Sequence, residues 1–416
     1  MTFQLRYLVR WKRFILLFLV IGSSHTQGAV YYLDNLQGND DNEGQTAESP
    51  WRSLDHAKLR PLFPGDRLLL RRGSTWDESL ELRYSGSQAS PIVVGAYGDG
   101  LPPRVESVYI SSNHLILEDI IVDHNKKPGD AIRISESSHI SLRHVTARYG
   151  TSDGIDIQNS RNIVIQNSLI HHFLGGSFIH QADAHGVVAT NTRWLKLQDT
   201  EIHHVSGDSF QTDPARNGML ISNDIVIRDC HFWTGPLIED FNSGWKKTAH
   251  LREHERQYPG ENAIDTKVAK SNWQAVPRMR ILVENLIVHG WKSDNYIRNK
   301  AAFNFKEKIE ATVVGAKVFD NEIAFRIRGN RGNANVSIKN CMITHSEKAF
   351  RIEDNLYHLQ ITDSYLGSGI QKMLEISGGK SGQKSWLITN NTFVGSKPKV
   401  ASDPSNRVIR SDSPKK

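Results

Sequence analysis

The sequence predicts an all-β protein, a right-handed parallel β-helix of about ten coils with an N-terminal cap. Three observations carry this prediction: a repeated strand-like unit, a column of Asn, Asp and Gly inside that unit, and a second strand whose polar and apolar residues alternate. Solenoids grow by stacking, so a chain of 416 residues fits one without a very large core. With 38% hydrophobic residues and 31 glycines, the composition indicates a folded, turn-rich chain.

The repeated unit is first seen at His114–Val122. Similar units begin at positions 139, 162, 194, 224, 280, 310, 335, 358 and 386. Several intervals are 23 to 30 residues long, with a longer gap between 224 and 280. A near-constant period of strand-like units is typical of a solenoid.

One position of this unit holds residues suited to a sharp bend. Its occupants are Asp119, His144, Asn167, Asp199, Asp229, Asn285, Gly315, Asn340, Asp363 and Asn390. Asn, Asp and Gly tolerate a left-handed backbone conformation, so we expect a bend here in every coil. A leucine-rich repeat would require a leucine pattern that this sequence lacks.

The first 28 residues are interpreted as a signal peptide. A basic segment precedes the apolar run Phe14–Ile21, which is shorter than the roughly 20 residues that span a bilayer, and a small polar stretch follows. We expect a secreted or periplasmic protein with no membrane span after cleavage; an uncleaved anchor is the alternative. Without the four basic residues of this segment the net charge falls from +6 to about +2, which gives no support for nucleic-acid binding.

The rest of the chain divides into three expected parts. They are a cap at 29–104, the β-helix at 105–395 and a disordered tail at 396–416, rich in Pro, Ser and Lys. Within the cap we expect, in order, a strand at 30–34, a short helical stretch after Pro50 and a strand at 67–71, followed by the segments 73–76 and 91–97.

An insertion at 233–259 occupies the long interval before residue 280. It contains Trp245 and Tyr258, and we expect it to wall a groove and stack on sugar rings. The alternative is that it covers an exposed sheet edge.

The two cysteines, Cys230 and Cys341, share one position of the repeat, several coils apart. Stacking at ~4.8 Å per coil would hold them too far apart for a disulfide. We therefore expect two buried thiols.

A second strand of each coil carries the functional signal. In Asn262–Lys267 the side chains of Asp265 and Lys267 alternate onto one face. Aligned strands place on that face, in chain order, Asp153, Asp156, His185, Asp208, Gln211, Asp213, Asp265, Lys267, Asn304, Lys306, Arg326, Arg328 and Arg351. This face passes from acidic to basic, and stacked like charges repel, so it suits an extended anionic chain with a cation or an acid–base apparatus at the junction. The alternative for the basic residues is a solvated sheet face.

The chemistry that fits this face is β-elimination on a uronate, which needs carboxylate neutralisation, a base for the C5 proton and an acid for the leaving oxygen. We expect Lys267 to be the base, with its pKa lowered by a stacked Lys306. Arginine can neutralise a carboxylate bidentately. The ligands we expect for Ca²⁺ are Asp208, Asp213, Glu261 and Asp265.

The histidines form two groups. His185 begins one of the outward strands, so we expect it to be catalytic. The pairs His171–His172 and His203–His204 lie near bends, where we expect exposed side chains rather than ligands.

Glu261–Lys267, followed some coils later by Arg326 and Arg328, resembles the β-helical polysaccharide lyases of family six, the alginate lyases and chondroitinase B, and more loosely the family nine pectate lyases. The motif order of residues 30–104 likewise resembles the cap of secreted β-helix proteins that act on polysaccharides. The family six resemblance implies Lys267 as base, Arg326 or Arg328 as acid and Glu261 as a Ca²⁺ ligand. The family's Asn-Lys-Ser is replaced here by Asp-Thr-Lys-Val.

Taken together, these patterns predict an exported, monomeric lyase that cleaves an acidic, uronate-containing polysaccharide. The substrate contacts we expect are Lys306, Asn304, Arg351, Gln211, Trp245 and Tyr258. Three alternatives stay open: a C5-epimerase, a glycoside hydrolase using two of the aspartates 153, 156, 208 and 213, and a non-catalytic polysaccharide-binding or export protein of the envelope. The sequence leaves the identity of the polysaccharide open.

Overall fold

The computed structural model describes residues 28–177, 180–213, 222–237, 258–267, 274–293, 297–306, 308–330, 332–378 and 385–410. Residues 1–27, most of the expected signal peptide, lie outside these ranges, as do Trp245 and most of the insertion. No helix within these ranges is long and apolar enough to cross a membrane.

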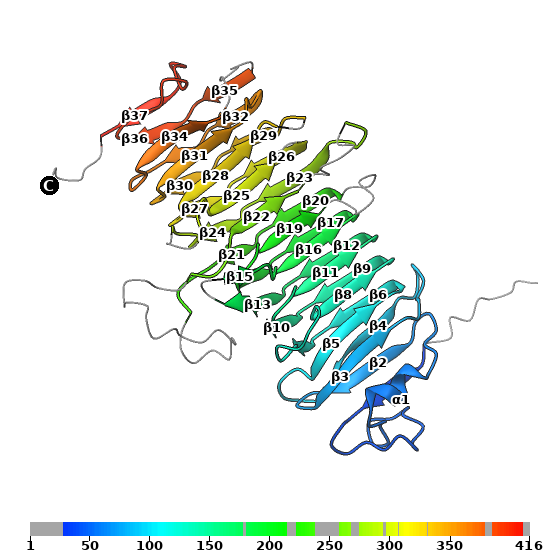
Figure 1. Cartoon of the computed structure of the whole chain (residues 1–416). Helices are drawn as coiled ribbons and strands as arrows, with labels where there is room; N and C mark the ends of the chain where they lie inside the picture. Colours follow the sequence, from blue (N-terminus) through cyan, green and yellow to red (C-terminus); the bar gives the residue numbers. More distant parts are fainter. Residues whose placement is uncertain are drawn as a thin grey trace, which may run out of the picture.

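One parallel sheet, sheet A, runs the length of the molecule (Figure 1). In spatial order its strands are β1 Val30–Leu33, β2 Arg67–Arg71, β4 Ile92–Tyr97, β6 Asn113–Glu118, β9 Ser138–Arg143, β12 Arg161–Gln166, β17 Arg193–Gln198, β20 Asn223–Arg228, β23 Met279–Glu284, β26 Ile309–Val314, β29 Asn335–Lys339, β32 His358–Thr362 and β35 Ser385–Thr389. The strand expected at 67–71 is therefore present as β2, residues 92–97 form β4, and hydrogen bonding runs without a break from the expected cap into the coils.

The second sheet consists of two columns of parallel strands. Column B1 contains β7 Ile121–Asp123, β10 Thr146–Gly150, β13 Leu169–Phe173, β18 Glu201–Val205, β21 His231–Trp233, β24 Ile287–His289, β27 Lys317–Phe319, β30 Met342–Thr344, β33 Tyr365–Leu366, β36 Thr392–Val394 and β37 Arg407–Ile409. Column B2 contains β8 Ile132–Ser135, β11 Ile155–Gln158, β16 Val187–Thr190, β19 Phe210–Asp213, β22 Asn262–Thr266, β25 Ala301–Lys306, β28 Ile323–Arg328, β31 Lys348–Glu353 and β34 Lys372–Ser377. Each coil passes through a strand of sheet A, then B1, then B2, which is the path of a parallel β-helix.

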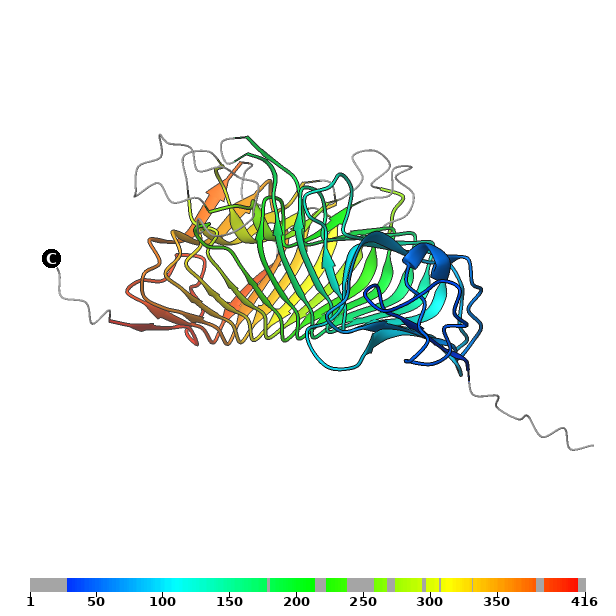
Figure 2. The same cartoon turned by 90° about the horizontal axis from the view of Figure 1, so that it is seen from below.

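Three further features complete the fold. At the N-terminal end, β3 Thr75–Leu82 pairs with β5 Arg104–Ile110, which pairs with both β7 and β8. The helix α1, Leu54–Lys58, lies at this end, and the coils stack from there towards the C-terminal end (Figure 2). A two-stranded hairpin, β14 Gly175–Ser177 and β15 His180–Ala182, leaves the coil between β13 and β16. Order extends into the expected disordered tail, because β37 pairs with β36.

The predicted bends are confirmed. All ten residues of the Asn/Asp/Gly column have positive φ, between 46° and 68°. A second column with positive φ, at the start of sheet A strands, was not predicted; it comprises His114, His139, Asn162, Trp194 and Asp224. The sequence prediction overlooked it because its residue types are mixed and include Trp194, a bulky residue in which this conformation is rare.

Asn340, with φ 51°, offers a test of these bends. Replacing it with Ala is expected to lower the free energy of unfolding by about 1 kcal/mol, because Ala tolerates the left-handed region poorly. The Asn340→Gly variant should be close to neutral, since Gly adopts this conformation freely. Urea unfolding of both variants checks this, and equal losses would contradict the backbone explanation.

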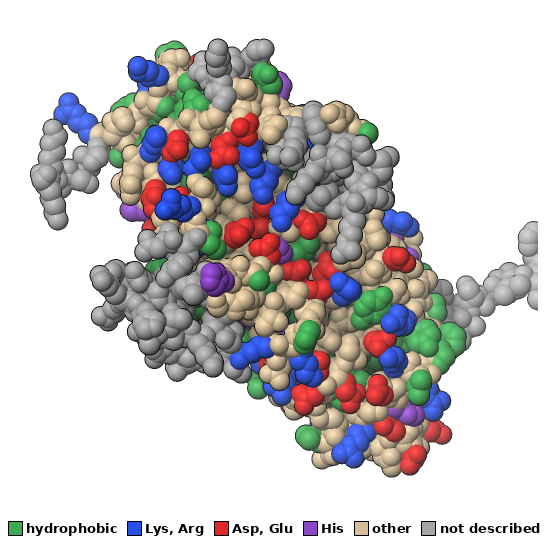
Figure 3. Space-filling view, viewed as in Figure 1, with side chains coloured by type: hydrophobic (Ala, Val, Ile, Leu, Met, Phe, Trp, Pro, Cys, Tyr) green, Lys and Arg blue, Asp and Glu red, His purple; other side chains and the backbone are tan. Residues whose placement is uncertain are grey.

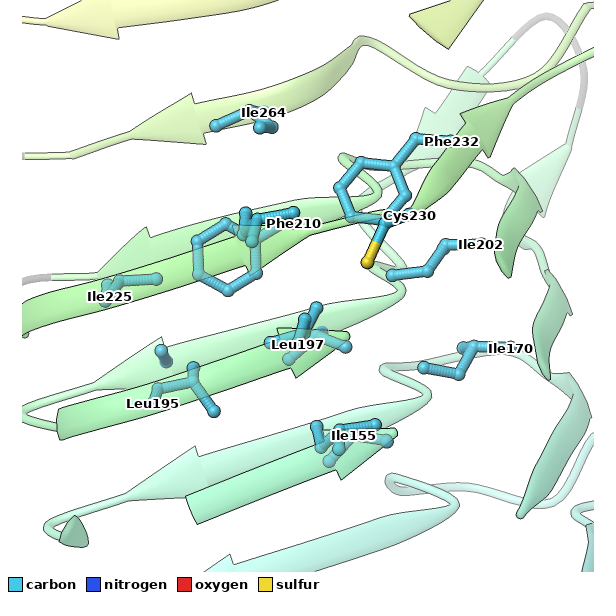
Figure 4. Close-up of a cluster of buried hydrophobic side chains, with 14 of the residues drawn as sticks. Ile155, Ile170, Leu195, Leu197, Ile202, Phe210, Ile225, Cys230, Phe232 and Ile264 are labelled. Carbon is cyan, nitrogen blue, oxygen red and sulfur yellow. The ribbon is translucent and has the colours of Figure 1, made fainter. Parts of the chain in front are cut away.

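The core lies between the sheets and is filled by inward-facing apolar side chains. Ile155, Phe210 and Ile264 of column B2 face Leu195 and Ile225 of sheet A (Figure 4). In the later coils Phe303, Phe325 and Phe350 stack, with ring centroids 4.5 and 5.6 Å apart. Both cysteines are buried and unpaired, as expected.

Candidate active site

Column B2 aligns the predicted site residues into two ladders on its outer face. The first ladder runs Arg133, Asp156, Val188, Gln211, Asp265, Asn304, Arg326, Arg351 and Glu375. The second contains Gln158, Thr190 and Asp213 and, later, Lys306, Arg328 and Glu353, with Lys267 beside Asp213. Acidic side chains gather at the middle of this face, and basic ones gather towards the C-terminal coils (Figure 3). The predicted change of charge along the face is confirmed.

Lys267 lies on the acidic side of that change. Its Nζ is 3.8 Å from Asp213 Oδ1, and the pair is about one-third exposed. Burial lowers the pKa of Lys267, but the carboxylates of Asp213 and Asp265, among others, raise it more, so the net shift is upward. The expected depression by Lys306 is therefore wrong, because the Lys306 ammonium donates a 2.6 Å hydrogen bond to Asp265 Oδ2.

The four predicted metal ligands lie close enough to repel one another. Burial, then Asp265 and Glu261, raise the pKa of the fully buried Asp208, whose Oδ1 accepts a 2.8 Å hydrogen bond from Asn262. Burial also raises the pKa of Glu261, with further contributions from Asp183 and Asp265. For Asp213, burial raises the pKa by more than Lys267 lowers it. Burial is the largest cause of all three upward pKa shifts.

Amide oxygens complete this acidic cluster. In the described part of the chain, Gln211 Oε1, Asp265 Oδ1 and Asn304 Oδ1 are buried without a hydrogen-bond partner. They come from three successive strands of the first ladder, ~4.8 Å apart at the backbone. No three of the predicted carboxylates place ligand atoms within 4.8 Å of one another, so a carboxylate-only site is incomplete. Mixed carboxylate and amide oxygens fit the hard-oxygen preference of Ca²⁺.

His185 is buried rather than exposed on the outer face of column B2. Its Nδ1 accepts a 2.7 Å hydrogen bond from the backbone N–H of Asp208. Burial lowers the pKa of His185 to about 4, so the ring is neutral near pH 7. This geometry favours a positioning role for His185, which fixes the backbone of Asp208.

The basic end of the face converges on one acid that the sequence did not single out. Glu353 lies 3.1 Å from Arg326, 3.2 Å from Arg328 and 2.7 Å from Arg351. Burial raises the pKa of Glu353, but Arg326 and the other arginines lower it more, so the net shift is downward. The arginines are therefore partly neutralised and held in fixed positions. Arg351 also donates a hydrogen bond to Asn299 Oδ1.

Two further acids lie on the earlier coils. Asp156 accepts hydrogen bonds from Arg133 and Gln158, at 3.1 and 2.6 Å. Burial raises the pKa of Asp153 to about 7, against a lowering hydrogen bond from the His185 N–H to its Oδ1. Asp153 is thus partly protonated near neutral pH.

Asp153→Asn should change how stability depends on pH. The pKa of Asp153 in the folded protein, about 7, exceeds its ordinary value of 3.8. Between these two pH values the folded wild type binds one proton more than the unfolded chain, so its stability falls as the pH rises. We expect the variant to be about 2 kcal/mol more stable near pH 8.5, discounting the full shift for partial exposure, and equal to wild type near pH 4. Denaturant unfolding in chelator at both values measures this. The control is Asp320→Asn, a half-exposed residue whose φ of 56° suits Asn; a similar gain there would contradict the assignment.

Of the insertion, only Tyr258 and Pro259 lie next to β22 within the described residues. The Tyr258 carbonyl accepts a 2.9 Å hydrogen bond from Lys300 Nζ, and the Pro259 carbonyl accepts one of 2.8 Å from Thr234. Gln181 of the β14–β15 hairpin accepts a 3.1 Å bond from Gly260 N–H. These contacts fix the start of the strand that carries Asp265. Sequence reasoning missed Lys300 and Gln181, since neither belongs to an aligned column.

The sequence and the structure were compared with those of known proteins. No protein-family model matches the chain. A 78-residue segment, 18% of the chain, is 36% identical to a lacto-N-biosidase from Bifidobacterium longum, and the chain spans only 5% of that protein.

Three solved structures are similar over most of the chain. A rhamnogalacturonan lyase has a TM-score of 0.55 at 14% identity, with 88% of this chain and 87% of that one covered. Pectate lyase Pel9A has a TM-score of 0.52 at 12% identity, covering 88% and 80%. The A-module of the Azotobacter vinelandii mannuronan C-5 epimerase AlgE6 has 0.51 at 13% identity, covering 84% and 91%. The chain therefore has the right-handed parallel β-helix fold that these polysaccharide-active proteins share.

Proposed function

We propose that this protein is an exported polysaccharide lyase that cleaves a uronate-containing chain by β-elimination. The observation that carries the proposal is the position of Lys267, in a ladder with carboxylates on one side and the Glu353-centred arginines on the other. The fold shared with two lyases and an epimerase supports the same class. Export rests on the basic and apolar pattern of residues 1–28.

In this proposal Lys267 Nζ takes the C5 proton, the C4–C5 double bond forms and the bond from C4 to the leaving oxygen breaks. Arg328 lies in the same ladder about two rungs on, on the order of 10 Å between backbones, and Arg326 lies in the neighbouring ladder. Either guanidinium can protonate or hydrogen-bond the leaving oxygen, and Arg351 can hold a second carboxylate.

Lys267 must lose its own proton before it can act as a base. The surrounding carboxylates oppose that loss, because they raise its pKa. Asp265, Gln211 and Asn304 are the residues that would hold Ca²⁺, with Glu261 and Asp213 close by. Ca²⁺ bound there would supply positive charge that offsets these carboxylates and the uronate. We therefore expect activity to depend on the cation.

The test is ultraviolet absorbance of the unsaturated product, with alginate, pectate, hyaluronan and chondroitin as substrates. A rise on one of them that a chelator abolishes and Ca²⁺ restores supports the proposal. New reducing ends without the absorbance, or inverted C5 centres by NMR with no cleavage, would overturn it in favour of a hydrolase or an epimerase respectively.

A glycoside hydrolase is the second candidate, and one observation favours it. Burial raises the pKa of Asp153 to about 7, which suits a general acid, and Asp156 follows three residues later, in β11. In that case Asp153→Asn should abolish the release of reducing ends while Lys267→Ala leaves it nearly unchanged.

A further inference from the structure

Four histidines on column B1 form a cluster outside the proposed active site. His171 lies in register with His203 on the next coil, and the rings stack with centroids 4.9 Å apart. His172 and His204 stack in the same way, also at 4.9 Å. His171, His172 and His204 are buried, so the expectation that these pairs are exposed is wrong.

Backbone geometry turns the members of each pair towards one another. His172 and His204 have φ of 58° and 50°, which brings two consecutive side chains to one side of the strand. The rings of each pair are nearly perpendicular, at 87° and 86°. Their Nδ1 atoms lie 2.6 Å apart in the first pair and 2.7 Å apart in the second.

Burial keeps the cluster neutral. It lowers the pKa of His171 and His204 to about 4 and that of His172 and His203 to about 2. Near pH 7 each ring therefore has one N–H and one nitrogen lone pair. Neutral imidazole is the form that binds transition metals.

The hydrogen bonds of the second pair assign its tautomers. Pro236 lacks a backbone N–H, so its carbonyl accepts the hydrogen bond and the His204 ring donates it. The donor is His204 Nε2, because His204 Nδ1 faces His203. His204 Nδ1 is then an acceptor, and His203 Nδ1–H donates to it. The lone pair of His203 is thus on Nε2, and a hydrogen-bonded neighbour fixes the ring, as is usual for metal ligands.

We propose that His171, His172 and His203 bind a transition-metal dication of the zinc class, with His204 orienting His203. In the described part of the chain, this is the one group of three His, Cys, Asp or Glu ligand atoms that lie within 4.8 Å of one another. Imidazole nitrogen suits Zn²⁺, Co²⁺, Ni²⁺ and Cu²⁺, whereas Ca²⁺ prefers the oxygens of column B2. Zn–N bonds of about 2.0–2.1 Å require the rings to turn from their present positions and the His171–His172 hydrogen bond to break, which frees a lone pair on each ring; the partly exposed His203 gives access.

The proposed ion would link β13 to β18. Trp233 stacks on His203 from the next coil, 4.6 Å between centroids, and covers that side of the cluster. The ion would therefore stabilise the coil from which the β14–β15 hairpin leaves.

The experiment uses the full chain, stripped with chelator and titrated with Co²⁺. We expect visible d–d bands that saturate at one equivalent, disappear on adding Zn²⁺ and persist in excess Ca²⁺. Zn²⁺ should also raise the thermal midpoint by several degrees, since a ligand that binds only the folded state stabilises it. Absence of bands, or displacement of Co²⁺ by Ca²⁺, would overturn the proposal.

Variants locate the site. His203→Gln, at a partly exposed position, is expected to fold and to lose the Co²⁺ bands, and His171→Ala should do the same. The control is His139→Asn, which removes the exposed ring of the stacked His114–His139 pair on sheet A, keeps a residue suited to φ 58° and should keep the bands. Circular dichroism without metal confirms that each variant folds. Unchanged bands in folded His203→Gln would contradict the assignment.

Discussion

Lys267→Ala is expected to lower kcat for the elimination by about a hundred- to ten-thousand-fold, the usual contribution of a positioned base. The side chain is part-buried among Asp213, Asp265 and Asp208, so its removal takes away the ammonium group that is paired with Asp213. Absorbance of the unsaturated product under saturating substrate and Ca²⁺ measures the loss. Folding should survive, because the ion pair with Asp213 is about one-third exposed and weak.

Two companion variants sharpen this test. Lys267→Arg keeps the positive charge, but the guanidinium has too high a pKa to act as a base. This variant should bind the substrate and turn it over almost as slowly as the alanine variant. Lys196→Ala, on the outer face of sheet A, removes an equal charge far from the ladders and should leave kcat unchanged. Activity of Lys267→Ala within a few-fold of wild type would remove Lys267 from the mechanism.

Glu353→Gln should destabilise the protein and at the same time tighten its binding of polyanions. The carboxylate is buried among three arginines, so its neutralisation leaves like charges facing one another. We expect a loss of about 2 kcal/mol in the free energy of unfolding, less than for a fully buried pair because the arginine side chains are 17–29% exposed. The released guanidinium groups should lower KM for the uronan.

The pH dependence of this loss has a definite sign. The folded pKa of Glu353 lies below its ordinary 4.5, so its contribution is present above that pH and fades as pH falls through the folded value. Wild type and Glu353→Gln should therefore differ most near neutral pH and converge in acid. Glu310→Gln, an exposed position on sheet A, is the control and should change neither quantity. A loss that persists unchanged in acid would show that charge pairing is not its cause.

Local rules account for what the sequence predicted well. Asn340 and the other bend residues are set by backbone sterics within a single residue, so the column could be identified without knowing what packs against it. Strand period alone placed Gln211, Asp265, Asn304 and Arg326 on one face, and the observed register confirms that order.

The partner of each charge could not be predicted in the same way. Lys306 reaches Asp265 rather than stacking freely over Lys267, and this choice depends on side-chain rotamers in neighbouring coils. Glu353 lies in the same ladder as Arg328, yet its contact with three arginines at once follows from the lateral spacing of the two ladders. For the same reason the pKa of Lys267 is shifted upward, whereas the sequence led us to expect a downward shift.

The sequence by itself therefore determined the solenoid, its bends, its two free cysteines and the acidic-to-basic order of one face, because each depends on local conformation or strand period. Only the tertiary structure decided that His171 and His203 are brought together across 32 residues. It also decided that the amide oxygens of Gln211 and Asn304 lie buried without a hydrogen-bond partner on the strands next to Asp265, and that three arginines share one acid. These features arise between coils, where burial and the distance between side chains set the energies of charged and polar groups.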